Sequence, residues 1–452
     1  MTSNDVEIDG VTILCGDARD RLSEIPDGSV HVCVTSPPYW GLRDYKTGTW
    51  DGGDPNHEHD VVAARGGRGG SGSNSKQSSF PSDVPAWVCS CGARLVDYQI
   101  GREKSPEEYV SALVEVFRES RRVLRDDGIL WLNCGDTYCG YHGNSKVPDD
   151  EAPSNKPGYY ENMRATTVGV SGLKSKDLVC IPWMLAMALR TDGWYLRSAM
   201  PWVRRAALPD SAADRPGSCL EYVFMFVKSQ RYYFDMEAVR RPPSGISGGA
   251  KFGKTSLDGP GSRECTKEDR ERYANTGRQW RNSDLWFESV DSPHGLVGVG
   301  DELVGLDVNP KSYAGAHFAT FPLQLVRSLL KPSISPEGCC GKCGTQHERV
   351  VEKTDVVDES HHGSRFDVGK TGERDGGDRT QAGDRFVSRT AGWRAACDCQ
   401  AATEKCVVLD PFGGSGTVAE VSRELGCRSI LIELNPDYVP LIRKRLSQGL
   451  LI

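Results

Sequence analysis

Two short motifs near the ends of the chain carry residue types that suit chemistry through hydrogen bonds. Near the N-terminus, Ser36-Pro37-Pro38-Tyr39 combines a hydroxyl, fixed backbone carbonyls and an aromatic ring. The two prolines restrict the backbone, and no amide donor at the next residue competes for the Pro37 carbonyl. Taken alone, this motif is also compatible with a rigid surface turn.

The second motif, Asp410-Pro411-Phe412-Gly413-Gly414-Ser415-Gly416-Thr417, lies between a predicted strand at 406–410 and a predicted helix at 417–425. Glycine lets a ligand approach the backbone, and a helix N-terminus favours an anionic group. The next predicted strand, 428–432, ends at Glu433, where an acid characteristically accepts hydrogen bonds from ribose hydroxyls. The loop matches neither the dinucleotide nor the phosphate-loop pattern, which favours a nucleoside cofactor without a pyrophosphate. An ordinary strand-to-helix connection is the alternative.

The apolar patterns around these motifs are those of an α/β protein. Strands are predicted at 11–15, 30–34, 129–132, 194–200 and 221–227, and helices at 18–25, 105–124, 178–189, 321–330 and 437–447. The chain ends at Ile452, too soon after Glu433 for further strands, so the rest of the sheet must come from upstream. Ligands of such sheets bind at the carboxyl ends of the strands, so we expect the two motifs to face each other.

Composition narrows the class of protein. The 55 Lys and Arg residues against 62 Asp and Glu give a net charge of −7, so any nucleic-acid surface must be local. The chain has neither a long apolar run nor the layout of a signal peptide, which predicts a soluble intracellular protein with no membrane partner. In such a compartment, the 16 Cys residues favour metal ligands or buried thiols over disulfides.

Taken together and in this order, Thr35-Ser36-Pro37-Pro38-Tyr39-Trp40 and the 410–417 motif resemble the β-class amino-DNA methyltransferases. In that family the catalytic motif precedes the S-adenosylmethionine motif. Further similarity is found in Gly16-Asp17, in 317–322 (His-Phe-Ala-Thr-Phe-Pro), and in 221–223 with the Lys228 and 232–235 that follow. The resemblance covers both ends and the middle of the chain but not the insertions.

The resemblance implies a doubly wound, Rossmann-like methyltransferase fold that is circularly permuted and carries zinc-ribbon-like insertions. It implies four catalytic residues, Ser36, Pro37, Pro38 and Tyr39. It also implies a set of residues that bind S-adenosylmethionine: Asp17, His317, Phe318, Phe321, Pro322, Asp410, Pro411, Phe412, Gly413, Gly414, Ser415, Gly416, Thr417, Glu433 and Asn435.

The residues of the first motif suit transfer of a methyl group to an amine. An exocyclic amine conjugated to a base is a poor nucleophile, so acceptors must draw its lone pair out of conjugation, and the Ser36 hydroxyl and Pro37 carbonyl can do so. Tyr39 would stack on a base flipped out of the duplex. Methylation at cytosine C5 instead needs a nucleophilic Cys, which follows Pro in that family, and the chain has no Pro-Cys dipeptide.

In the family, Ser at the first motif position goes mostly with N4 of cytosine and Asp with N6 of adenine. Ser36 therefore favours cytosine, and adenine is the alternative. Two other classes remain open. One is a methyltransferase for RNA or a protein amide, and the other is a zinc-bearing nucleic-acid binder without activity.

Two groups of Cys and His residues have spacings that suit a metal. Cys340, Cys343, Cys397 and Cys399 bracket a polar segment, and Gly344 follows the first pair as in a zinc knuckle, which predicts a structural zinc site. A less regular set, His57, His59, Cys89 and Cys91, predicts a second site. Thiols without a metal are the alternative for both.

A target recognition region is expected between the catalytic and cofactor elements, where several Arg residues gather. Those expected to contact DNA are Arg204, Arg205, Arg240, Arg241, Arg278 and Arg281. The solvated surface is the alternative for each of them. Duplex DNA is the expected partner, and a cognate restriction enzyme and a second copy of this chain are partners to test. A cytoplasmic, nucleoid-associated protein of a prokaryote or phage is expected.

The chain is predicted to divide as follows: residues 1–50 and 100–234 form the catalytic half; 51–99 form an insertion, Gly- and Arg-rich and a candidate for metal binding; 235–310 form the target recognition region; 311–335 and 400–452 form the cofactor half; and 336–399 form an insertion with the four-Cys site. Within the last insertion, residues 353–394 are charged and poor in aliphatics, which predicts a loop or linker.

Overall fold

The structure, a computed structural model, divides the chain into two units. The residues that it describes are 5–41, 47–54, 56–57, 59, 62–63, 87–89, 91–139, 172–174, 176–204, 214–217, 220–239, 306–307, 322–355 and 386–448. The first unit comprises 1–233, 308–330 and 407–452, and the second comprises 234–307 and 331–406. The first unit therefore combines the two ends of the chain with its middle.

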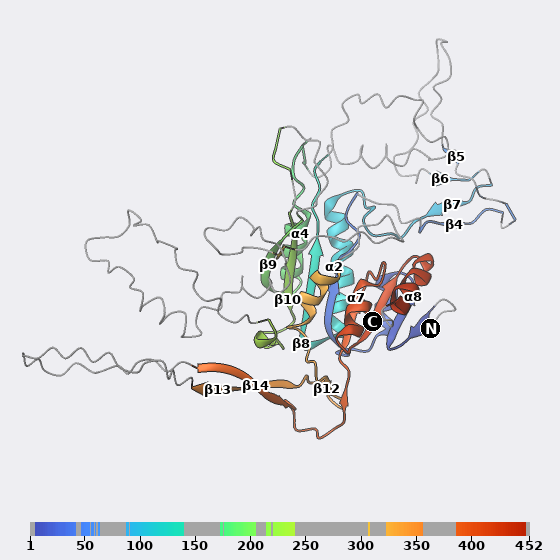
Figure 1. Ribbon diagram of the computed structural model, residues 1–452. Helices are drawn as coiled ribbons and strands as arrows, with labels where there is room; N and C mark the ends of the chain where they lie inside the picture. Colours follow the sequence, from blue (N-terminus) through green and yellow to red (C-terminus); the bar gives the residue numbers. More distant parts are fainter. Residues whose placement is uncertain are drawn as a thin grey trace, which may run out of the picture. The chain divides into compact units, whose positions relative to one another are not determined.

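The main sheet of the first unit is mixed. Its strands run in the order β1 (Val6–Ile8), β2 (Val11–Cys15), β17 (Arg428–Glu433), β16 (Val407–Asp410), β3 (Val30–Thr35), β8 (Leu124–Cys134), β10 (Leu220–Val227) and β9 (Tyr195–Val203). The strands from β2 to β8 in this order pair in parallel, whereas β1, β10 and β9 pair antiparallel to their neighbours. The N-terminal blue strands and the C-terminal red segment consequently lie side by side (Figure 1).

Helices cover this sheet. They are α1 (Ala18–Arg21), α2 (Pro106–Val123), α4 (Ile181–Thr191), α6 (Leu323–Leu330), α7 (Thr417–Glu424) and α8 (Val439–Gln448), with the 3-10 turns η1 (Leu22–Glu24) and η4 (Pro436–Tyr438). In β3 and β16 every residue is buried, so both faces of the sheet are covered there. Contacts of α2 with α4 and of α6 with α7 join the helices into layers.

The step from α2 to β8 illustrates how local signals set these elements. Ser105 caps α2, its side chain accepting a hydrogen bond from the Glu108 amide, and Pro106 occupies the first turn. The helix ends at Val123, and Leu124 already pairs with Val30 of β3. The predicted helix at 105–124 thus matches the observed one, and pairing with the sheet begins where it ends.

The two halves of the sheet meet where β3 pairs with β16. Val408 and Leu409 lie opposite Val32 and Cys33. At the carboxyl ends of these strands, the buried Thr35 hydroxyl donates to Asp410 Oδ1 at 2.7 Å. This bond joins the strand before the first motif to the strand before the second.

The insertion after the first motif has its own small sheet within the first unit. Its strands run in the order β4 (Thr49–Asp51), β7 (Arg94–Val96), β6 (Trp87–Val88) and β5 (Val62–Ala63), all antiparallel.

The second unit contains short strands and the turn η2 (Met236–Ala238). Its strands are β11 (Leu306–Asp307), β12 (Cys339–Cys340), β13 (Glu348–Asp355), β14 (Phe386–Arg394) and β15 (Thr403–Glu404). β13 and β14 pair antiparallel, so both ends of the segment predicted as a loop are strands. Their exposed side chains, such as Glu352 and Arg389, lack the apolar alternation by which a half-buried strand is recognised.

The predicted mixed α/β architecture with a large sheet is confirmed. Within the described ranges, none of the helices has the length and apolar character needed to cross a membrane.

We expect the Thr35–Asp410 bond to contribute measurably to stability. Thr35→Val keeps the side-chain volume but leaves a buried carboxylate oxygen without its hydroxyl donor, which costs about 1–3 kcal/mol. Urea unfolding at pH 8, followed by tryptophan fluorescence, should show this loss. Thr35→Ser, which loses a methyl group and keeps the hydroxyl, is the matched control. A Val variant as stable as the wild type would show that the bond contributes nothing.

Candidate active site at the carboxyl edge of the sheet

The parallel pairing brings the ends of several strands to one edge of the sheet. β3 ends at Thr35, β16 at Asp410, β17 at Glu433 and β8 at Cys134. β10 runs antiparallel to β8, so its first residues, including Glu221, lie at the same edge. The Ser36–Tyr39 motif and the glycine loop both begin there, as expected from their positions after strands.

A hydrogen-bond network holds the first motif. Ser36 Oγ donates to Asn133 Oδ1 at 3.0 Å, and Tyr39 Oη donates to Glu221 Oε2 at 2.6 Å. Asn133 and Glu221 are both buried. Arg204 Nη1 lies 3.1 Å from Glu221 Oε1, so a cation compensates the buried carboxylate.

The contacts of Asn133 determine the direction of these bonds. Its amide nitrogen donates to Glu221 Oε2 and to the Tyr222 carbonyl, both at 3.2 Å. Its oxygen therefore faces Ser36 and acts as the acceptor, and the Ser36 hydroxyl must be the donor. The lone pairs of Ser36 Oγ are left for a donor from another molecule.

Close packing against Gly135 fixes the ring of Tyr39. A Cβ atom added at Gly135 would lie 2.4 Å from Tyr39 Cε2, so only glycine leaves room for the ring there. Burial raises the pKa of Tyr39 well above its ordinary value, and the Glu221 charge adds to this effect. Tyr39 therefore remains a hydrogen-bond donor across the working pH range.

The prolines of the motif differ in their hydrogen bonding. Tyr109 Oη donates to the Pro38 carbonyl at 2.8 Å, which anchors the loop on α2. Pro38 has no amide hydrogen, so it donates no backbone hydrogen bond.

The glycine loop is folded around the Glu433 carboxylate. Glu433 Oε2 accepts from the Gly414 amide at 2.7 Å, and Oε1 accepts from the Asn435 amide at 2.9 Å. A Cβ atom at Gly413 would lie 3.0 Å from Leu431 Cβ, and Gly416 has a φ of +78°. Each carboxylate oxygen can accept more than one bond, so Glu433 keeps acceptor capacity for a ligand.

Two buried carboxyls lie at this edge. Burial raises the pKa of Asp410 to about 7, against the opposing hydrogen bonds from Thr35 and the Phe412 amide. Burial likewise raises the pKa of Glu433 to about 7, and the Asp410 charge adds to the shift. Both groups therefore change charge near neutral pH.

Hydrogen bonds from Arg445 fix the side chains of Ser415 and Thr417. Arg445 Nη1 of α8 donates to Ser415 Oγ at 2.6 Å and to Thr417 Oγ1 at 2.7 Å, and Arg445 also pairs with Glu420. These hydroxyls thus hold the loop in place.

The other predicted cofactor residues are only partly described. The Asp17 carboxylate caps α1 and pairs with Arg19, and Asn435 caps η4 by accepting from the Asp437 amide. The Pro322 carbonyl accepts from the Val326 amide at the start of α6. His317, Phe318 and Phe321 lie outside the described residues. The ligand roles of all these residues stay predictions.

The structure brings all four residues of the first predicted metal set together, and three of the four residues of the second. The sulfur atoms of Cys340, Cys343, Cys397 and Cys399 all lie within 4.8 Å of one another. Ligand atoms of His57, Cys89 and Cys91 meet the same limit, and His59 Nδ1 lies 3.3 Å from Cys91 Sγ. Identification of a metal in either set remains a prediction.

Of the Arg residues expected to contact DNA, the structure describes Arg204. Because Arg204 forms an ion pair with Glu221, it lies beside the hydrogen-bond network of Tyr39. Arg205, Arg240, Arg241, Arg278 and Arg281 lie outside the described residues.

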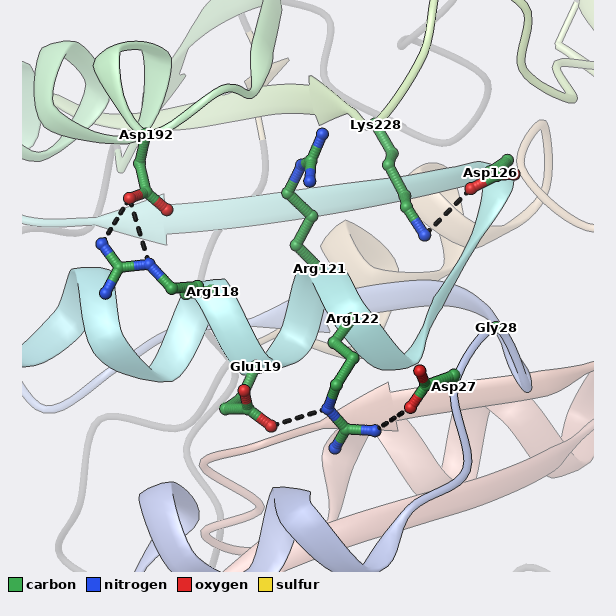
Figure 2. A pocket seen from close by; sticks show the side chains of 9 residues that line it. All are labelled: Asp27, Gly28, Arg118, Glu119, Arg121, Arg122, Asp126, Asp192 and Lys228. Atoms are coloured by element: carbon green, nitrogen blue, oxygen red, sulfur yellow. Dashed lines mark hydrogen bonds and ion pairs between the residues drawn. The ribbon is translucent and has the colours of Figure 1, made fainter.

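A pocket of about 660 Å³ lies away from both motifs, near Gly28 before β3 and Asp126 in the first part of β8. Most of its charged side chains pair among themselves: Arg118 with Asp192, Arg122 with Glu119 and Asp27, and Lys228 with Asp126 (Figure 2). Arg121 also lines the pocket. These pairs leave little unmatched charge for a ligand, and we assign the pocket no role in the reaction.

Sequence reasoning did not assign site roles to Asn133, Gly135 or Glu221. Each is one residue at the end of an apolar strand, without a characteristic spacing. The available signal was a polar or glycine residue directly beside such a strand, which is where ligand sites of α/β sheets form.

Comparison with known proteins identifies the family. The N6/N4 methyltransferase model, described as DNA methylase, matches residues 30–340 and 400–444. The chain is 30% identical over 445 residues to the type II methyltransferase M.Cfr9I of Citrobacter freundii, covering 98% of this chain and 90% of that protein. It is also 30% identical over 438 residues to M.XycI of Xanthomonas campestris pv. cyanopsidis, covering 97% and 88%.

Among solved structures, the PvuII DNA methyltransferase, which is cytosine-N4-specific, aligns with a TM-score of 0.45 at 12% identity, covering 96% of this chain and 86% of that one. The matches in sequence establish that the chain belongs to the N6/N4 DNA methylase family. The predicted resemblance is confirmed, and the protein is a DNA methyltransferase of this family.

We expect the stability of the ligand-free protein to fall as pH rises from about 4 to 8. The native Asp410 and Glu433 retain protons up to about pH 7, whereas unfolded Asp and Glu release them near 3.9 and 4.3. The native state thus binds more protons in this window, and the stability is lost as pH rises through 7.

Asp410→Asn keeps an oxygen acceptor for Thr35 and removes one titration, so its melting temperature should fall less over this range than that of the wild type. Asp437→Asn, at an exposed site, is the control and should keep the wild-type profile. Equal slopes for the wild type and Asp410→Asn would contradict the shift at Asp410.

Proposed function

We propose that this protein transfers a methyl group from S-adenosylmethionine to the exocyclic N4 amine of cytosine in duplex DNA. The observation that carries the proposal is the orientation of Ser36. Its hydroxyl donates to Asn133, so its oxygen can accept a proton of the target amine.

The acceptors act on the electronic state of the amine. The lone pair of an exocyclic amine is delocalised into the base, and hydrogen bonds from its two protons to fixed acceptors favour a pyramidal, nucleophilic nitrogen. Ser36 Oγ supplies one acceptor. The Pro37 carbonyl supplies the second, since the neighbouring Pro38 carbonyl already accepts from Tyr109.

The target base must leave the duplex to reach these acceptors. Tyr39 would stack on the extruded base with the ring face that is turned away from Gly135. The bond from Tyr39 Oη to Glu221 and the close fit against Gly135 fix the ring beforehand. Binding therefore costs little side-chain entropy at this position.

The glycine loop fits a nucleoside cofactor. The close approach of Gly413 to Leu431 leaves little room for a side chain, and the Glu433 carboxylate is oriented by two backbone amides. Glu433 would accept from the ribose hydroxyls, and Phe412, Gly414 and Asn435 would line the nucleoside site. When bound, S-adenosylmethionine supplies an electrophilic methyl group on a sulfonium, whose positive charge the nearby carboxylates favour.

We favour cytosine over adenine as the target base because Ser36 occupies the first motif position. N6-adenine methylation is the alternative within the family. Methylation of RNA or of a protein amide is a more remote alternative, which membership in the DNA methylase family disfavours.

The cofactor half follows the catalytic half in the chain, since β16 and β17 come after β3 in sequence. We infer a circularly permuted form of the doubly wound methyltransferase fold. The region 235–310 is proposed to read the target sequence.

Sequence relatives named as type II methyltransferases support a role in restriction and modification. A cognate restriction enzyme is the partner this implies, and the cytoplasm of a prokaryote or phage-infected cell is the proposed location. A homodimer is a further assembly to test.

Nucleoside mass spectrometry tests the proposed function. The full chain is incubated with mixed-sequence duplex DNA and methyl-labelled S-adenosylmethionine, and the digested nucleosides are identified. We expect N4-methylcytosine. Ser36→Ala should lower the rate about 10²- to 10³-fold, because one fixed acceptor is lost, without loss of cofactor binding.

Ser23→Ala, which removes an exposed hydroxyl bonded to the Asp20 carbonyl, is the control and should keep full activity. If the product were N6-methyladenine, the target base would be adenine instead of cytosine, and the proposed mechanism would be kept. Full activity of Ser36→Ala would contradict the role of Ser36, and absence of any methylated nucleoside would contradict the proposal.

A further inference from the structure

The four-Cys cluster lies within residues 331–406 of the second unit, where the turn at 340–343 meets residues 397–399. Cys340 belongs to β12, which pairs with β15, and Cys397 and Cys399 lie just before β15. The intervening chain runs through the β13–β14 hairpin. A cross-link at this cluster would thus close a loop of about 50 residues whose sequence is poor in aliphatic residues.

The backbone at Cys340 and Cys343 already has the form of a metal-binding knuckle. The Gly344 amide donates to the Cys340 carbonyl at 2.7 Å, and the Cys340 amide donates to the Thr345 carbonyl at 2.9 Å. Gly344 has a φ of +70°, which glycine adopts without strain. This tight turn points both thiols to the same side.

The distances favour a single ion. Tetrahedral coordination with Zn–S bonds of about 2.3 Å places the sulfur atoms roughly 3.8 Å apart. All four sulfur atoms lie within 4.8 Å of one another, a limit that the tetrahedral spacing satisfies. An iron–sulfur cubane would sit between its ligands and hold their sulfur atoms farther apart.

We propose that Cys340, Cys343, Cys397 and Cys399 bind one structural zinc ion, which clamps the base of the β13–β14 hairpin. Four thiolates complete the tetrahedral coordination and leave no open position for a substrate or water. This zinc therefore stabilises a fold element and takes no part in methyl transfer.

The first unit contains a second candidate metal site, which is formed by other residues. Cys89 and Cys91 lie in the turn between β6 and β7, where the Gly92 amide donates to the Cys89 carbonyl at 2.9 Å. His57 and His59 follow β4, which pairs with β7.

The fit of the backbone around this second cluster is close. A Cβ atom at Gly53 would lie 2.8 Å from Cys91 Sγ, so glycine is needed where the chain passes the cluster. One imidazole and two thiolates meet here, from His57, Cys89 and Cys91. His59 Nδ1 lies 3.3 Å from Cys91 Sγ, beside this cluster, and is the fourth donor available. We infer that they bind a second structural zinc ion, which holds together the small sheet of β4 to β7.

Metal analysis of the full chain, purified without added metal or chelator, tests both sites. We expect two zinc ions per chain by inductively coupled plasma mass spectrometry. The double variant Cys340→Ser/Cys397→Ser should retain one, and His57→Ala/Cys91→Ser should retain the other. Cys180→Ser, at an exposed Cys outside both clusters, should retain two.

Thiol labelling of the wild type provides a readout that does not depend on the folding of variants. Mass-mapped alkylation should modify Cys343, Cys397 and Cys399, which are at least partly exposed, only after a zinc chelator is added. Exchange with Co²⁺ should give the absorption of tetrahedral thiolate coordination. A chain without metal, one that contains iron, or one whose cluster thiols react equally with and without chelator would overturn the proposal for that cluster.

Discussion

The pairing of β3 with β16 is the contact on which the site depends. These strands are separated by most of the chain, yet their parallel register brings Thr35 and Asp410 within a 2.7 Å hydrogen bond. One strand leads into the Ser36 motif and the other into the glycine loop. In the proposed reaction, the distance between an amine held at the first motif and a methyl donor held at the second would therefore be set by the sheet, and not by the loops.

This arrangement places charged groups out of water. Asp410 and Glu433 lose hydration on burial, which raises the pKa of each to about 7. Backbone amides and the Thr35 hydroxyl compensate part of the cost. The buried Glu221 is compensated in the same way by Tyr39, Asn133 and Arg204. Such preorganised polar groups are costly to fold, and in the proposed reaction they would bind the cationic cofactor and orient the amine.

The sequence predicted those parts of the site whose residues follow strands or carry fixed spacings. The double proline, the glycine loop, Glu433 and the Cys pairs belong to this class. Asn133 and Glu221 could not be assigned, because they meet Ser36 and Tyr39 only through the register of β8 with β10, in which Asn133 lies opposite Val223. The β13–β14 hairpin was expected as a loop, because exposed strands lack an apolar face. The family, in contrast, was predictable from two motifs and their order, and the matching relatives confirm it.

A crystal structure of the full chain with S-adenosylhomocysteine would test most directly whether the two motifs form one site. We expect the ribose hydroxyls to bind the Glu433 carboxylate and the thioether sulfur to face Ser36 and Pro37. A nucleoside bound away from Glu433, or a sulfur atom separated from Ser36 by protein, would contradict a single active site at the carboxyl edge of the sheet.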